Sequence, residues 1–175
     1  MTMTDSVSII GGADGPTAVY VAGTVGRNWI NMFGLIFVIL FLIPNIIYAI
    51  QMKKKNRKIV NQCPVKWLNI LEGIGRYGCM ILMVFSIGMR EFGFESVTAF
   101  LIYLLGNSVL TVAYWTVWML YFVKPTEVKQ VVRGALATAL FLLSGITLKY
   151  VLLVIFAVLF GVTHFYVVKK NQEQF

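Results

Sequence analysis

A few ionisable side chains stand in apolar surroundings, and they are the residues best suited to chemistry. Asp14 lies in the string Gly-Gly-Ala-Asp-Gly-Pro-Thr, just ahead of a long apolar run. Glu72 and Arg76 lie near the start of another apolar segment, and His164 is the one histidine of the chain. An ionised group in apolar surroundings is costly unless it is paired or binds an ion. These four side chains are therefore the candidates for ion binding or proton transfer.

The stretch around Asp14 interrupts regular structure. Its glycines permit backbone conformations that other residues avoid, and Asp14 favours a turn by bonding to its own backbone. Pro16 fixes the exit from the turn, and Thr17 could help to start a new helical turn. In membrane proteins such breaks occur where the freed backbone groups line a polar cavity, and unwound carbonyls beside a carboxylate are suitable Na⁺ ligands.

Composition places the chain among membrane proteins. It is 59% hydrophobic and 13% charged over 175 residues, whereas soluble domains carry about 25% charged residues. The mean hydropathy is +0.81. The net charge of +8 resides largely in short basic clusters between apolar runs, so we expect topology signals and no nucleic-acid partner. Cys63 and Cys79 are expected to be free thiols, because two cysteines are too few for a disulfide framework.

Five apolar runs are each long enough for a helix that crosses the bilayer, which takes about 20 residues. The predicted spans are residues 28–52, 68–89, 96–123, 131–147 and 150–168. The last two are divided at residues 144–149, where Ser144 and Gly145 lower helix propensity and Lys149 can reach water. Pro44 predicts a kink in the first span, and Asn45 could satisfy a freed backbone group.

The sequence thus predicts an all-α integral membrane protein of the cell membrane, with a bundle at residues 28–175 preceded by a separate segment at residues 1–27. Basic residues are retained in the cytoplasm, so their distribution sets the orientation. With the N-terminus outside and the C-terminus cytoplasmic, Arg27, Arg90 and Lys149 lie outside. The larger cytoplasmic set is Lys53, Lys54, Lys55, Arg57, Lys58, Lys66, Lys124, Lys129, Arg133, Lys169 and Lys170.

The segment Ser-Ile-Ile-Gly-Gly-Ala-Asp-Gly-Pro-Thr-Ala-Val-Tyr-Val-Ala-Gly, residues 8–23, resembles a signature of sodium-translocating decarboxylase β subunits. In that family the aspartate of this string belongs to an intramembrane Na⁺ site. The resemblance implies that Asp14 is a Na⁺ ligand, with Gly12, Gly15 and Thr17 as its immediate setting. It covers residues 8–23 only, and the remainder of the chain is not recognised.

Two interpretations of residues 1–27 stay open. The segment could be an exposed leader whose glycines and Asp14 face water, because it is too short to cross the membrane twice. It could instead be a re-entrant or surface-docked element that turns Asp14 into the bundle. The same choice exists for Glu72 and Arg76, which share a helical face at i, i+4 spacing. They form either a pair near the cytoplasmic interface, with Arg76 reaching water, or a charge pair along an ion or solute path.

The other polar and small residues of the spans are expected to serve packing. Gly73, Gly75 and Gly78 would let a neighbouring helix approach closely. Asn107 would form an interhelical hydrogen bond, with ligand binding as the alternative. His164 is expected at the membrane interface. Trp118 and Tyr121 are likewise expected at a membrane boundary, where aromatic residues are enriched.

Two classes of function follow. The first is sodium-linked transport, alone or as a subunit of a sodium-translocating complex, with Na⁺ as the bound ion. The second is a membrane scaffold or accessory subunit without transport. No phosphate-binding loop or nucleophile motif is visible, so enzyme activity has no support in the sequence. Five short helices offer little interior for a path, so besides the lipid bilayer we expect a homo-oligomer or a partner membrane subunit.

Overall fold

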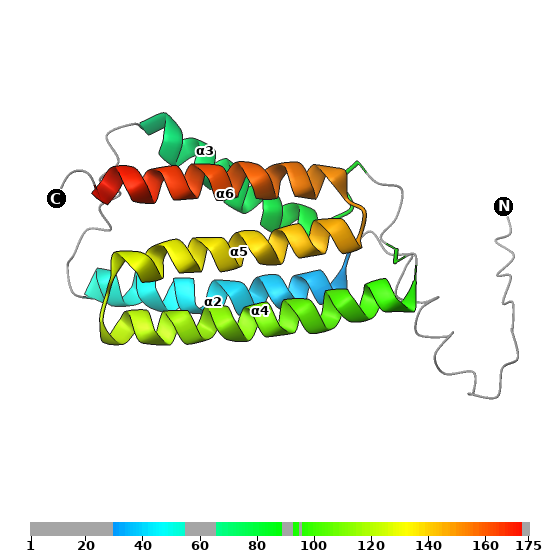
Figure 1. Cartoon of the computed structure of the whole chain (residues 1–175), viewed down its shortest axis with the longest axis horizontal. Helices are drawn as coiled ribbons and strands as arrows, with labels where there is room; N and C mark the ends of the chain where they lie inside the picture. Colours follow the sequence, from blue (N-terminus) through cyan, green and yellow to red (C-terminus); the bar gives the residue numbers. More distant parts are fainter. Residues whose placement is uncertain (1–29, 55–65, 89–92, 95, 173–175) are drawn as a thin grey trace, which may run out of the picture.

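The computed structural model describes residues 30–54, 66–88, 93–94 and 96–172. Within these ranges the chain forms five helices and no strand beyond an isolated bridge between Ile30 and Phe85. The helices are α2 Met32–Lys54, α3 Lys66–Val84, α4 Val97–Val123, α5 Glu127–Thr147 and α6 Val151–Gln172 (Figure 1). The predicted all-helical class is confirmed.

Four of these helices, α2, α4, α5 and α6, are long and apolar enough to cross a membrane. The fifth, α3, is 19 residues long and does not belong to this group. It includes Lys66, Glu72 and Arg76, whose charges lower its hydropathy. The described helices are therefore those of a multi-pass membrane protein, and α3 is the one predicted span that composition alone does not support.

The helices lie side by side in a bundle in which α5 is central (Figure 1). α5 packs along α4 on one side and along α6 on the other, and α3 packs along α6. α2 contacts α4 and α3. The connections from α4 to α5 and from α5 to α6 are three residues each, which makes these neighbours antiparallel.

The predicted division of the last apolar run is confirmed, but it falls later than the Ser-Gly pair. α5 continues through Ser144 and Gly145, and the turn lies at residues 148–150, where Lys149 has a φ of 50°. Gly145 is needed for packing, because a Cβ at this position would lie 2.7 Å from Cγ2 of Val154 on α6. The hydroxyl of Tyr150 then donates to the carbonyl of Ile87 and ties this turn to the end of α3.

Pro44 lies inside α2, which continues past it. Proline cannot donate to the carbonyl four residues earlier, which here belongs to Leu40. Nε1 of Trp115 on α4 donates to that carbonyl at 2.9 Å. The Asn45 side chain instead donates to the Phe41 carbonyl at 2.8 Å and to the Tyr114 hydroxyl at 2.9 Å. The freed group is thus satisfied by another helix, and Asn45 links α2 to α4 beside it.

Asn107 forms the interhelical hydrogen bond that the sequence predicts. It is fully buried on α4, and the Ser144 hydroxyl of α5 donates to its Oδ1 at 3.2 Å. A comparable contact joins α2 to α4, because Nδ2 of Asn31, just before α2, lies 3.2 Å from the Tyr103 hydroxyl. Such bonds are useful in an apolar bundle, since buried polar groups need partners.

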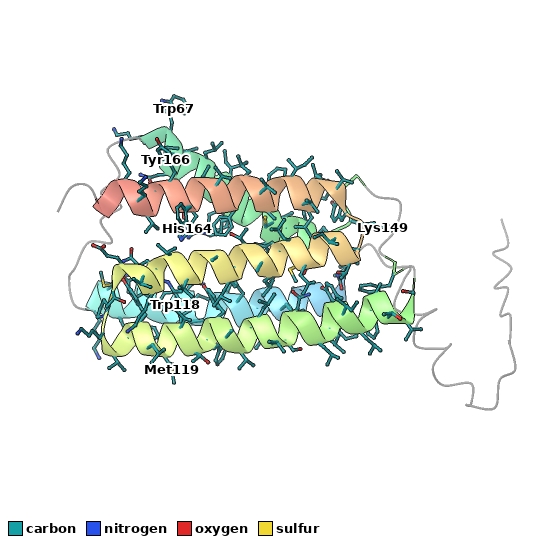
Figure 2. The ribbon with its side chains drawn as sticks, viewed as in Figure 1. Trp67, Trp118, Met119, Lys149, His164 and Tyr166 are labelled. Carbon is teal, nitrogen blue, oxygen red and sulfur yellow. The ribbon has the colours of Figure 1, made fainter. Side chains whose placement is uncertain are left out.

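Trp118 and Tyr121 are buried in the bundle, and their predicted place at the depth of a membrane boundary stays a prediction. They are 3% and 6% exposed, and Trp118 lies between the helices (Figure 2). The Arg133 guanidinium of α5 lies 4.0 Å from the ring centroid of Trp118 and 4.3 Å from that of Tyr121. The aromatic faces attract the cation, so these rings turn inward to hold Arg133.

Candidate functional site

The sodium site predicted at Asp14, with Gly12, Gly15 and Thr17, lies outside the described residues, as does Cys63. The choice between an exposed leader and a re-entrant element also falls on this part of the chain. The sodium site and the two interpretations of residues 1–27 therefore stay predictions. The candidate site within the described part of the chain is built on the other predicted pair, Glu72 and Arg76.

Glu72 and Arg76 lie one turn apart on α3, and the Arg76 guanidinium donates to Oε1 of Glu72. The Glu72 side chain is 6% exposed, whereas that of Arg76 is 37% exposed. Helical spacing produces this pair, because residues i and i+4 share a face. The carboxylate is thus turned into the bundle while the guanidinium reaches its edge.

His164 completes the cluster from α6. Its Nδ1 lies 2.8 Å from Oε1 of Glu72, although the two residues are 92 positions apart. The imidazole is 16% exposed and points toward α5 (Figure 2). His164 is thus turned into the bundle, and its predicted depth at the membrane interface stays a prediction. The sequence carried no signal for this contact, since only the packing of α6 along α3 brings the two residues together.

Glycines allow the close approach of helices that this contact needs. A Cβ at Gly134 of α5 would lie 1.9 Å from Cδ2 of His164, so a larger side chain would displace the imidazole. On α3, a Cβ at Gly75 would lie 2.9 Å from Cα of Phe160, and one at Gly78 would lie 2.2 Å from Cδ1 of Phe156. Packing roles are confirmed for Gly75 and Gly78. A Cβ at Gly73 would meet nothing within 4 Å, so that prediction is wrong.

The cluster is a carboxylate flanked by two nitrogen groups from different helices. The contact between Nδ1 and the carboxylate requires a proton on Nδ1 while Glu72 is ionised. Nε2 of His164 lies 3.5 Å from the Gln130 carbonyl of α5. Arg76 also lies over the Phe160 ring, 5.6 Å from its centroid. The arrangement can hold or pass a proton between α3 and α6, and it compensates the charge of Glu72 from both of these helices.

A metal centre is not formed by these groups. Nowhere in the described ranges do three histidine, cysteine or acidic side chains gather as a ligand set. Glu72 has one potential co-ligand, His164, and its other neighbour is a guanidinium.

The sequence indicates only a topology signal at Arg133. Its contacts with the aromatic rings of α4 depend on helix packing, which spacing along the chain does not reveal.

Comparison of the chain with protein-family models, with curated proteins and with solved structures finds no match.

Proposed function

We propose that the chain is a multi-pass membrane protein of sodium-linked transport, acting alone or as a subunit of a sodium-translocating complex. Asp14 is the Na⁺ ligand in this proposal, with Gly12, Gly15 and Thr17 around it. The Gly-Ala-Asp-Gly-Pro-Thr string carries the assignment of the ion. The described helices add a second feature, because an ionisable residue buried in a membrane bundle is by default a functional-site hypothesis. Glu72 is such a residue.

The proposal includes α3 as a fifth membrane span. Its charged Glu72 faces α6, whereas an exposed apolar stripe follows its outer face at helical spacing. The stripe consists of Trp67, Ile70, Ile74, Tyr77 and Ile81. A helix with inward polar groups and outward apolar groups fits a lipid environment. Composition therefore underestimates α3, because its buried Glu72 is shielded by α6.

An N-terminus outside and a C-terminus in the cytoplasm also belong to the proposal. The ends of α2, α4 and α6 and the starts of α3 and α5 lie at one end of the bundle (Figure 1). Lysines gather there in the described residues: Lys53, Lys54, Lys66, Lys124, Lys129, Lys169 and Lys170. Lys149 lies at the opposite end (Figure 2). Retention of basic residues favours a cytoplasmic lysine-rich end.

The decisive experiment compares thermal unfolding of the detergent-purified full chain in NaCl and in KCl at equal ionic strength. A ligand that binds only the folded state stabilises it by about 2.7 kcal/mol at 100 times its Kd. We expect Na⁺ to raise the Tm of the wild type and not that of Asp14→Asn. Asp5→Asn, a matched acid outside the string, should keep the response. Equal Tm values in both salts for all three proteins would refute the sodium assignment.

A scaffold or accessory subunit is the second candidate, and one observation favours it. The charge of Glu72 is already compensated within the chain by Arg76 and His164, as in a structural ion pair. In that case residues 1–27 would recruit a partner membrane subunit or a further copy of the chain. Removal of residues 1–27 would then abolish co-purification of that partner, and the interaction would be the same in NaCl and KCl.

A further inference from the structure

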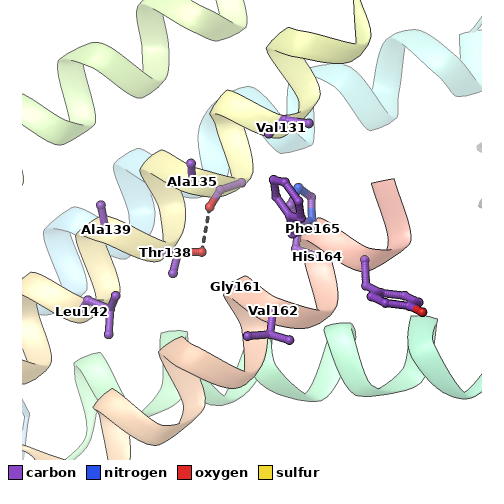
Figure 3. A pocket seen from close by; sticks show the side chains of 11 residues that line it. Val131, Ala135, Thr138, Ala139, Leu142, Gly161, Val162, His164 and Phe165 are labelled. Atoms are coloured by element: carbon purple, nitrogen blue, oxygen red, sulfur yellow. Dashed lines mark hydrogen bonds between the residues drawn. The ribbon is translucent and has the colours of Figure 1, made fainter. Parts of the chain in front are cut away.

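An apolar groove runs between α5 and α6 on the surface of the bundle (Figure 3). Its volume is about 530 Å³, within the range of about 300–1,000 Å³ that is typical of ligand sites. Small residues, Gly134, Ala135, Ala139 and Gly161, line it. Its rim is open, since Val162 and Phe165 are 63% and 58% exposed.

The groove offers an occupant almost no unused polar group. The Thr138 hydroxyl donates to the Gly134 carbonyl at 2.8 Å (Figure 3). The Nδ1 of His164 is engaged by Glu72. The other lining side chains are apolar apart from the Tyr166 hydroxyl. The surface that fills the groove must therefore be apolar.

The length of the groove matches a lipid chain. On α5 it extends from Val131 to Leu142, a rise of about 16 Å at 1.5 Å per residue. This is about half of the roughly 30 Å hydrocarbon core, which is the depth that an acyl chain occupies in one leaflet.

The charges at the mouth of the groove indicate the headgroup. Lys169 and Lys170 follow Phe165 and Tyr166 by four residues, so they lie one turn beyond the groove on the same side of α6. Glu127, at the start of α5, is the single acidic residue at this lysine-rich end among the described residues. Basic residues next to a membrane helix attract anionic headgroups.

We propose that the α5–α6 groove binds one acyl chain of an anionic phospholipid, whose phosphate lies at Lys169 and Lys170. The site is independent of Asp14, so it stands whether or not the chain binds Na⁺. It would cover Gly134 and Gly161 and would seal the side of His164 that faces the lipid.

Native mass spectrometry of the full chain released from nanodiscs tests this. The nanodiscs contain phosphatidylglycerol and phosphatidylcholine in equal amounts. We expect one phosphatidylglycerol to be retained per chain. Ala139→Phe fills the groove and should abolish retention, whereas Ala49→Phe, the same change at an exposed position of α2, should not. Lys169→Gln with Lys170→Gln should lower the preference for phosphatidylglycerol by roughly 25-fold, about fivefold for each lysine.

Three results would overturn the proposal. The first is equal retention by Ala139→Phe and Ala49→Phe with both variants monodisperse. The second is a loss of dimer mass in Ala139→Phe while its lipid stays bound, which would assign the groove to a second copy. The third is displacement of the lipid by millimolar inorganic phosphate, which would mean that Lys169 and Lys170 bind a free anion and that the groove contributes nothing.

Discussion

Glu72 accepts hydrogen bonds from side chains of two helices, Arg76 on α3 and His164 on α6. Its pairing with Arg76 is visible in the sequence, because i, i+4 spacing on a helix implies it. Its contact with His164 spans 92 positions. Helix periodicity carries no information over that distance, so only the packing of α6 on α3 could reveal it.

The contact between Glu72 and His164 predicts an energetic coupling. Glu72→Gln and His164→Gln should each lower the free energy of unfolding, because each leaves a buried polar partner poorly matched. The double variant should lose less than the sum of the two, by about 0.5–3 kcal/mol. Reversible unfolding in mixed micelles measures this cycle.

Glu127→Gln is the matched control for the cycle. Glu127 is exposed in the first turn of α5 and is not part of the cluster of Glu72, Arg76 and His164. Its loss should cost at most about 1 kcal/mol through the helix dipole and should be additive with His164→Gln. If Glu72→Gln and His164→Gln were additive as well, the contact would contribute nothing to the folded state.

Pro44 shows at the scale of elements how two helices depend on each other. The sequence predicts that α2 contains an unsatisfied carbonyl, since proline lacks a donor. It does not reveal that Trp115 of α4 supplies the replacement.

The boundaries of α5 and α6 also depend on the packing of one helix against another. The sequence predicts the break between them from the low helix propensity of small residues, but Gly145 stays helical because α6 packs directly against it.

Trp115→Phe should therefore destabilise the protein by about 1–3 kcal/mol, because the Leu40 carbonyl loses its donor. In a Pro44→Ala background the backbone N–H of residue 44 can bond to that carbonyl. There Trp115→Phe should lower the free energy of unfolding only slightly. Thermal unfolding of the four proteins measures the difference. Trp67→Phe is the control, since Trp67 is 79% exposed. A loss that is equal in both backgrounds would show that the Nε1 contact does not satisfy Leu40.

Charge asymmetry is the dominant feature of the whole molecule. All lysines of the described residues except Lys149 lie near one end of the bundle (Figure 1). Lys149 lies at the opposite end (Figure 2). The order of the helices around α5 explains how the outer surface stays apolar while Glu72, Asn107 and Arg133 are turned inward. The described bundle is thus apolar outward over most of its length and polar at selected interior contacts.

The proposed orientation predicts opposite accessibility of the two ends. In a Cys63→Ser background, where Cys79 is fully buried, Lys149→Cys should react with a membrane-impermeant thiol reagent in intact cells. Lys124→Cys should react only after permeabilisation. Thr4→Cys should behave like Lys149→Cys if α3 is a fifth span, because an odd number of crossings places the N-terminus opposite the lysine-rich C-terminal end. Labelling of Thr4→Cys only after permeabilisation would contradict five spans.

Composition and apolar run length by themselves determined the class of the protein, because the thickness of a bilayer dictates how long an apolar helix must be. Helix periodicity determined the Glu72–Arg76 pair, since that pair depends only on i, i+4 spacing in the sequence. Tertiary structure alone decided that His164 meets Glu72, that Arg133 lies on Trp118 and Tyr121, and that Trp115 completes α2. These contacts join residues far apart in the chain, and only the packing of particular helices brings their polar groups together; at His164 the close approach is permitted by Gly75, Gly78 and Gly134.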